Sequence, residues 1–386
     1  MLILVINCGS SSVKYDLLSV DRECSLARGI VERIGEKTSL LKHEKNGKDS
    51  FKKRLSCKNH HEAITIVRDI LIDTEHGVIS DAREVAGVGH RVVHGGEEFH
   101  SATLINDKVI ESIERFSELA PLHNPPALEG IRGCMKIFES VPQVAVFDTA
   151  FHHGMPEYAY CYGIPYEFYV RYGIRKYGFH GTSHKYVSIK AAELLGKPLE
   201  DINVITVHLG NGCSIAAVEK GKSIDTSMGF TPLEGLLMGT RSGDIDPAVV
   251  FFLMEKEKLS AGAINDVLNK KSGLLGVSGV SNDMRDILKA IEDGNHRAEL
   301  SYEIFVYRIK KYIGAYAAVL GTVDAVVFTA GIGENVPQIK DSIRDQLRHF
   351  LGSGTEFLTV STNEELLIAK DTREVIRSIH NSQHGG

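Results

Sequence analysis

The chain lacks several common sequence signals, and each absence narrows the function it can have. Its six cysteines include no CxxC pair, which argues against a zinc site and against a disulfide framework. No stretch approaches the ~18 apolar residues that span a bilayer. The short apolar start also has no basic residues before it, unlike a signal peptide. We therefore expect a soluble, cytoplasmic protein that does not interact with membranes.

An excess of basic residues is missing as well. The 386 residues include 44 Lys and Arg against 50 Asp and Glu, which gives a net charge of −6. Such a chain has no positive field to attract nucleic acid, so small molecules are the expected partners. At roughly 150 residues per domain, the length suggests two or three domains, and two is the simpler expectation.

The glycine-rich turns of this chain match neither the P-loop motif GxxxxGK[ST] nor the Rossmann motif, a GxGxxG turn that opens a helix. One other pattern occurs twice. Residues 2–18 read as a strand, the turn NCGSSS and a second strand, and residues 203–218 repeat this with the turn HLGNGCS. Glycine accepts positive φ, so consecutive N–H groups can surround an anion. For either segment alone an ordinary hairpin is the alternative. The repetition favours a duplicated fold that binds a nucleotide.

Hydrophobic periodicity predicts an α/β protein. Apolar residues recur at helical spacing over 62–73, 126–139 and 297–320. Residues 144–147 read as a buried strand, and we place the domain boundary near 150, just after it.

The C-terminal part adds a third candidate for nucleotide contact. Residues 324–329 read as a strand that enters a glycine turn at 330–335, and a helix begins at Pro337. Residues 364–380 read as a helix that packs back on the first domain.

Several segments place basic side chains beside glycine or proline. Arg91, in GHRVVHGG, would point its guanidinium at an anion, and a surface salt bridge is the alternative. His123, in LHNPP, would have a functional role or only accompany the start of a helix. His180, in YGFHGTSH, precedes a helix and suits a donor to a phosphoryl oxygen. A metal site formed by His180 and His184 is a weaker interpretation, because no third ligand lies nearby.

Residues 225–247 are unsuited to a core or a helix. The stretch DTSMGFTPLEGLLMGTRSGDIDP combines four acidic residues and one arginine with several glycines, which is typical of an active-site loop. Arg241 and Arg91 together would form a two-arginine clamp. Phosphoryl transfer needs such cations, because negative charge spreads over three oxygens in its transition state.

These segments together make the chain resemble the acetate kinase family, within the acetate and sugar kinase/heat-shock 70/actin superfamily. The matching segments cover nearly the whole length: NCGSSSVKY, GHRVVHGG, PLHNPP, VFDTAFH, YGFHGTSH, HLGNGCS with the loop above, and FTAGIGEN. The resemblance implies an α/β, two-domain, duplicated ribonuclease-H-like (actin-like ATPase) fold with mixed sheets, nucleotide in an interdomain cleft, and a homodimer. Domain one would be residues 1–149 with a C-terminal helix at about 363–386. Domain two would be residues 150–362.

The resemblance also implies an activity, its cofactors and its site residues. The activity is reversible transfer of the ATP γ-phosphoryl group to acetate, giving acetyl phosphate and ADP, with Mg²⁺ as the metal and Mn²⁺ as a substitute. The implied catalytic residues are Asp148, His180, Arg241 and Arg91. The substrate pocket is implied at Arg91, Val93, Leu122, Phe179 and Pro232, and the metal site at Asn7 and Glu364. The implied ATP contacts are Lys14, Ser10, Ser12, His208, Leu209, Gly210, Asn211, Gly212, Asp283, Met284, Arg285, Gly331, Ile332, Gly333, Glu334 and Asn335.

One departure from the family pattern affects this set. The segment between Asn335 and Glu364 is shorter than in typical members by about a loop and a strand, so the match of Glu364 is less secure than that of Asn7. Three alternatives remain: a propionate kinase of the same family, a pyrophosphate-dependent member, and a non-catalytic nucleotide switch or sugar-sensing repressor. Against a repressor, the first strand starts at residue 2 and leaves no room before it for a DNA-binding helix-turn-helix.

Overall fold

The computed structural model describes residues 1–45, 47 and 49–384. The chain divides into two compact units: unit 1 is Met1–Ala150 with Asn363–Gly386, and unit 2 is Phe151–Thr362. Within the described residues, no helix combines the length and the apolarity that a membrane crossing requires.

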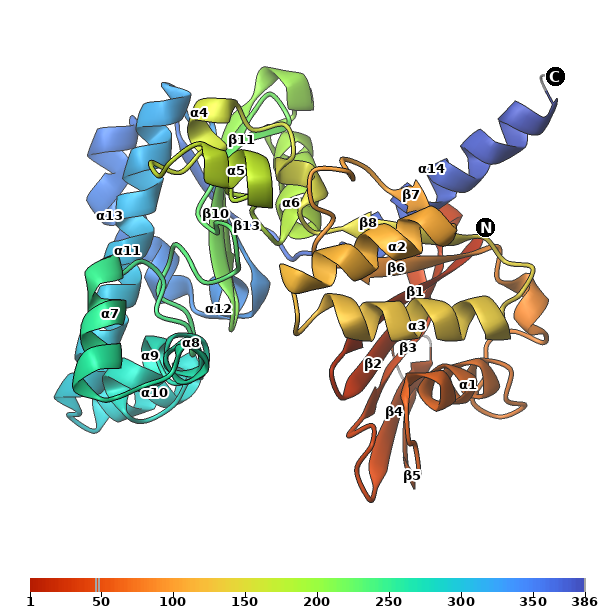
Figure 1. Cartoon of the computed structure of the whole chain (residues 1–386). Coiled ribbons are helices and arrows are strands. Elements are labelled where there is room, and N and C mark those ends of the chain that lie inside the picture. Colours follow the sequence, from red (N-terminus) through yellow and green to blue (C-terminus); the bar gives the residue numbers. More distant parts are fainter. Residues whose placement is uncertain (46, 48, 385–386) are drawn as a thin grey trace. The chain divides into compact units, whose positions relative to one another are not determined.

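Unit 1 contains an eight-stranded sheet in the order β5-β4-β3-β2-β1-β6-β8-β7. Strands β1 to β5 form an antiparallel meander, whereas β1, β6 and β8 run parallel (Figure 1). The strands are β1 Leu2–Gly9, β2 Ser12–Ser19, β3 Cys24–Glu32, β4 Ser39–Lys45, β5 Asp49–Leu55, β6 Gly87–Val92, β7 Thr103–Leu104 and β8 Gln143–Phe147.

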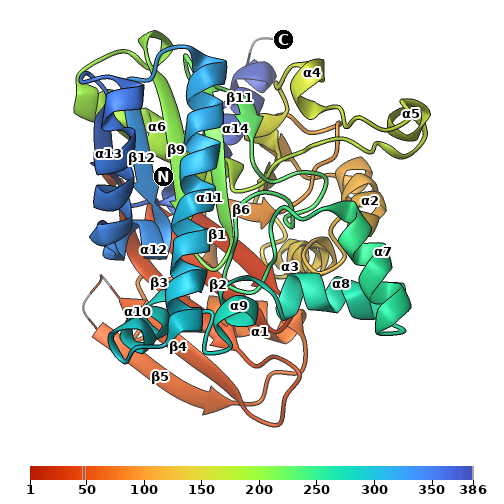
Figure 2. The ribbon, with the colours of Figure 1, turned by 90° about the vertical axis from the view of Figure 1, so that its left-hand side faces the viewer.

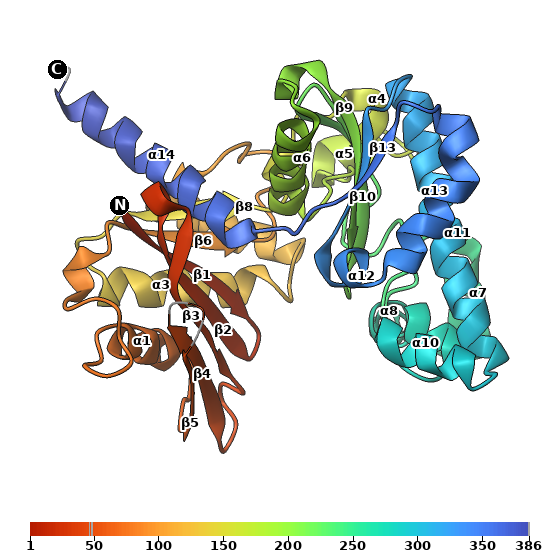
Figure 3. The ribbon, with the colours of Figure 1, turned by 180° about the vertical axis from the view of Figure 1, so that it is seen from behind.

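The helices of unit 1 cover both faces of this sheet. They are α1 His60–Leu71, α2 Asp107–Arg115, α3 Asn124–Ile137 and α14 Glu364–His384. Helices α1 and α3 bury Leu4, Ile6 and Cys8 of β1 on one face. Helix α14 packs on the opposite face, across β1, β6 and β8, as seen from behind in Figure 3. Glycine at positions 87 and 89 of β6 permits this close approach, because a Cβ there would overlap side chains of α14.

Unit 2 contains a five-stranded sheet in the order β11-β10-β9-β12-β13. Its strands are β9 Asn203–Leu209, β10 Cys213–Glu219, β11 Lys222–Thr226, β12 Ala325–Thr329 and β13 Glu356–Thr359. Its helices are α4 Glu157–Tyr160, α5 Glu167–Tyr172, α6 Gly181–Leu195, α7 Pro247–Lys256, α8 Ala261–Lys270, α9 Gly273–Ser278, α10 Met284–Glu292, α11 His296–Leu320, α12 Ala330–Asn335 and α13 Pro337–Leu351. Helix α6 packs on β9 and β12, and α11 covers β9 and β10 from the other face (Figure 2).

The two sheets share one topology. In unit 1 the order β3-β2-β1-β6-β8 joins an antiparallel trio to two parallel strands, and β11-β10-β9-β12-β13 does the same in unit 2. The repeat predicted from the two strand-turn-strand segments is therefore present in the strand order, and the mixed sheets of the predicted actin-like fold are confirmed.

One predicted turn is wrong. Residues 330–335 form helix α12 directly after β12. The Glu334 carboxylate accepts the N–H of Ala330 at 3.0 Å, and the N–H of Val336 donates to the Ile332 carbonyl at 3.0 Å. The two glycines of this segment suggested a turn, but the Glu334 carboxylate satisfies an N–H that a helix start otherwise leaves without a partner.

Candidate active site

The predicted polar residues of unit 1 lie where three adjacent parallel strands end. Ile6 of β1 pairs with His90 of β6, so Asn7 and Arg91 follow at neighbouring positions. Asp148 comes directly after β8, whose last residue pairs with Val92. In open α/β sheets the carboxyl ends of parallel strands are the usual place for a ligand site.

Arg91 is held between two carboxylates. Its Nε and Nη2 donate to both oxygens of Asp148 at 2.8 to 3.1 Å, and its Nη1 lies 3.4 Å from Glu364 Oε2. Burial alone would lower the pKa of Arg91, but Asp148 and Glu364 raise it, so the guanidinium stays charged. Its plane is fixed because Asp148 binds it in a bidentate manner.

Glu364, the first residue of α14, lies where carboxylates outnumber the cations close to them. Burial raises its pKa above the ordinary value; Arg91 opposes this shift, and Asp148 adds to it. One arginine thus neutralises two carboxylates, and the exposed Lys14 is the other cation that lowers the pKa of Glu364. A buried carboxylate short of compensation is suited to a cation.

These oxygen donors fit magnesium. Mg²⁺ is usually held by one or two carboxylates together with substrate phosphates, not by a protein cage. Within residues 1–45, 47 and 49–384 no cluster of three His, Cys, Asp or Glu is placed to hold a metal. The roles of Asn7 and Glu364 as metal ligands stay predictions.

A histidine that sequence reasoning missed supports the first turn. His60 Nε2 lies 2.7 Å from the Gly9 carbonyl oxygen, and its Nδ1 lies 2.8 Å from a Glu129 carboxylate oxygen. The buried ring lies between these two oxygens and contacts one with each nitrogen. It ties the turn that carries Ser10 and Ser12 to helices α1 and α3. No signal in the sequence links positions 9, 60 and 129.

In unit 2, His180 sits at the start of helix α6 in a left-handed conformation, with φ of 56°. Its Nδ1 contacts Ser214 Oγ at 2.9 Å, and its ring stacks on His208 with centroids 4.1 Å apart. Non-glycine residues seldom adopt positive φ, and such strain gathers at functional sites.

The metal interpretation of His180 and His184 is not supported. Both nitrogens of His184 are engaged, with Thr206 and Ser214 at 2.7 Å each. Burial lowers the pKa of His184 well below its ordinary value. This ring is a neutral support for the Ser214 hydroxyl, which itself contacts His180.

Arg241 lies against the glycine turn of unit 2. A Cβ added to Gly212 would stand 2.6 Å from Arg241 Nη2 and 3.4 Å from His180 Cε1, so both side chains border this turn. Arg241 Nη1 donates to the Pro232 carbonyl at 2.6 Å. Burial lowers its pKa, and no carboxylate among the described residues offsets this. A mostly buried guanidinium with no carboxylate beside it among the described residues is suited to an anion.

The predicted nucleotide segments converge in unit 2. A cavity of about 550 Å³ is lined by Gly210, Asn211, Asn282, Asp283, Met284, Arg285, Gly331, Ile332, Asn335 and Val336. Three chain regions therefore meet as predicted, while His208, Leu209, Gly212, Gly333 and Glu334 do not line the cavity. Asn282 was missed; its amide donates to Asn211 Oδ1 at 2.9 Å, and its position beside Asp283 was the available signal.

The predicted methyl pocket is divided between the units. Val93 and Leu122 belong to unit 1, where Leu122 is exposed, and Phe179 and Pro232 belong to unit 2, where Phe179 is buried. Their joint role stays a prediction.

The two mixed sheets with one strand order define the actin-like ATPase fold, and the cavity of unit 2 lies where three predicted nucleotide segments meet. The sequence model of the Acetokinase family matches residues 2–383. An acetate kinase from Caldanaerobacter subterraneus subsp. tengcongensis is 55% identical over 401 aligned positions, which cover 98% of this chain and all of that protein. The alignment is longer than the 386 residues here, so that relative contains residues this chain lacks.

Solved structures agree. Porphyromonas gingivalis acetate kinase superposes with a TM-score of 0.93 at 44% identity, covering 97% of this chain and 99% of that one. A propionate kinase from Francisella tularensis subsp. tularensis gives 0.91 at 43% identity with the same coverage. This chain belongs to the acetokinase family, and the predicted resemblance is confirmed.

Proposed function

We propose that this chain is an acetate kinase that transfers the γ-phosphoryl group of ATP to acetate, reversibly, to form acetyl phosphate and ADP. Beyond family membership, the observation that carries the proposal is Arg241, a mostly buried cation beside the turn at Gly212 that has no carboxylate partner in the part of the chain that the structure describes. A protein that only binds the nucleotide could hold its phosphates with backbone N–H groups alone. A guanidinium without a counter-ion suits the charge that develops on a phosphoryl group in transfer.

The chemistry needs no general base. Acetate is ionised at neutral pH, so its oxygen attacks the γ-phosphorus directly and the bond to the ADP oxygen breaks. Both oxygens of Asp148 accept from Arg91, and Asp148 therefore orients that arginine. Arg91 would bind the acetate carboxylate, while Arg241 and His180 would stabilise the phosphoryl oxygens, so that catalysis comes from positioning and charge neutralisation.

Asn7 and Glu364 would hold Mg²⁺, which neutralises charge on the phosphate oxygens of ATP when bound. Lys14, Ser10 and Ser12 would contact phosphate in unit 1, and the cavity of unit 2 would receive the nucleoside. We further propose that the enzyme is a cytoplasmic homodimer, which follows from the family resemblance and the sequence composition.

A substrate panel tests the function. The purified chain is incubated with ATP, hydroxylamine and acetate, propionate or butyrate, with Mg²⁺ or with EDTA, and the acyl phosphate is trapped as the hydroxamate. We expect the highest kcat/KM for acetate and a lower value for propionate, because one methylene group changes transition-state binding by only ~1–3 kcal/mol. EDTA should abolish turnover.

Other results would lead to different conclusions. A higher kcat/KM for propionate would make the chain a propionate kinase, the reading that the Francisella structure keeps open. Turnover with pyrophosphate and not ATP would indicate the pyrophosphate-dependent member. Nucleotide binding without any hydroxamate would contradict an enzyme and favour a switch.

A further inference from the structure

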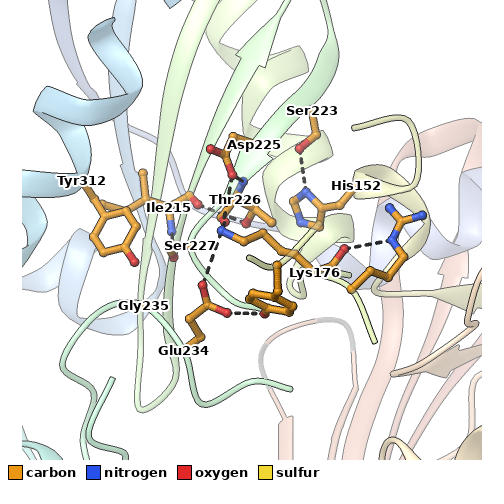
Figure 4. Close-up of polar contacts among 12 residues, drawn as sticks. His152, Lys176, Ile215, Ser223, Asp225, Thr226, Ser227, Glu234, Gly235 and Tyr312 are labelled. Atoms are coloured by element: carbon orange, nitrogen blue, oxygen red, sulfur yellow. Dashed lines mark hydrogen bonds and ion pairs between the residues drawn. The ribbon is translucent and has the colours of Figure 1, made fainter. Parts of the chain in front are cut away.

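A buried lysine connects the segment that carries His180 to the loop that carries Arg241. Lys176 has a side chain only 14% exposed. Its Nζ donates to the Thr226 carbonyl at 3.0 Å and lies 3.6 Å from Asp225 and 3.5 Å from Glu234 (Figure 4). The ammonium group thus makes one hydrogen bond, to Thr226, and ion pairs with two carboxylates.

Contacts around Lys176 fix both segments to each other. The N–H groups of Tyr177 and Gly178 point to the Gly229 carbonyl at 3.0 and 3.3 Å. The Tyr162 hydroxyl donates to the Glu234 carboxylate and accepts from the N–H of Phe230 at 2.8 Å. The first part of the loop is therefore held against residues 176–178, directly ahead of His180.

The far end of the same loop is anchored separately. Asp244 accepts from the N–H of Gly235 at 2.8 Å and from the Tyr312 hydroxyl at 2.7 Å, and its own N–H donates to the Gly235 carbonyl at 2.9 Å. Arg241 lies between these anchors and donates to Pro232, which lies between Phe230 and Glu234. Displacement of the part near Glu234 would thus move the guanidinium.

From this geometry we infer that Lys176 is a positioning residue for phosphoryl transfer, which acts through the loop to place Arg241 relative to His180. The inference rests on the proposed function. Without the ammonium, Asp225 and Glu234 would lose their shared cation, and burial already raises the pKa of Asp225. The loop would then relax at the point where it supports Arg241.

The test measures kcat and KM in Lys176→Met, which keeps the chain length and removes the charge. We expect kcat to fall on the order of 10- to 100-fold, because a displacement of about 1 Å at the reacting centre has this effect. KM for ATP should change little, since Lys176 does not line the cavity. Lys190→Met is the matched control. Lys190 pairs with Glu193 on the exposed side of α6, and its loss should leave kcat unchanged.

Two further variants keep the inference falsifiable if Lys176→Met does not fold. In Gly229→Ala, the atoms nearest to the new Cβ would be the ends of the Glu234 and Tyr162 side chains, so the methyl group breaks their contacts with the loop without meeting backbone first. That variant should fold and still lose kcat, whereas Gly154→Ala, whose Cβ meets nothing within 4 Å, should not. In an Arg241→Ala background, Lys176→Met should add less than about a threefold loss, because the two groups act as a unit.

Parent-like kcat in Lys176→Met or in Gly229→Ala would overturn the inference, as would a fully multiplicative loss on top of Arg241→Ala. An inactive parent enzyme would instead refute the proposed function. The two failures are therefore distinguishable.

Discussion

Replacing Arg241 with alanine is expected to lower kcat by about 10²- to 10³-fold, because one preorganised donor to the developing charge contributes roughly 3 to 4 kcal/mol to transition-state stabilisation. Arg241 carries no structural ion pair among the described residues. Its removal breaks one hydrogen bond, to the Pro232 carbonyl, so the melting temperature should fall only slightly while kcat falls by orders of magnitude. Steady-state kinetics and thermal unfolding of the same preparation separate the two effects.

A surface arginine of the same unit serves as the control. Arg344 pairs with Asp341 and Asp345 on α13, and Arg344→Ala should retain parent kcat. Turnover of Arg241→Ala within a few fold of the parent enzyme would show that the guanidinium has a structural role only.

Replacing Arg91 with alanine is expected to damage both catalysis and stability. The acetate carboxylate would lose the cation proposed to bind it, and kcat/KM for acetate should fall by at least about 10²-fold. Asp148 and Glu364 would remain buried without their shared partner. Removal of one member of a buried ion pair costs about 3 kcal/mol or more, so the free energy of unfolding should fall by a similar amount at pH 7.

The pH dependence and a double variant identify the cause. Glu364 already has a raised pKa, and Arg91 is the group that opposes this shift. In Arg91→Ala the raised pKa means that stability is present below the ordinary value near 4.5 and is lost as pH rises through the folded-state pKa. Arg91→Ala/Glu364→Gln should regain stability at pH 7 but not activity. Recovery of activity, or a stability deficit that does not depend on pH, would contradict the assignment.

Arg91 could be singled out from the sequence because glycines flank it at the end of a probable strand, whereas the family resemblance supplied Asn7 and Asp148. Adjacent parallel strands bring the three residues together. The two glycine turns were found because one repeats the other. These signals come from residues that are close together in the chain, so the sequence alone is enough to detect them.

Contacts made across long sequence separations were not predictable. The link from His60 to Gly9 depends on how α1 packs beside β1, and the Lys176 cluster unites residues 50 and 58 positions apart. Tertiary packing decided these features, and periodicity carries no information about it.

The stereochemical course at phosphorus tests the account most directly. In the proposed mechanism, acetate attacks the γ-phosphorus of bound ATP in one in-line step, with fixed cations and no covalent enzyme intermediate. With ATP made chiral by oxygen isotopes at the γ-phosphorus, the acetyl phosphate formed should show inversion of configuration. Retention would require a phosphorylated enzyme and a second displacement, and would contradict the direct transfer proposed for Arg91, His180 and Arg241.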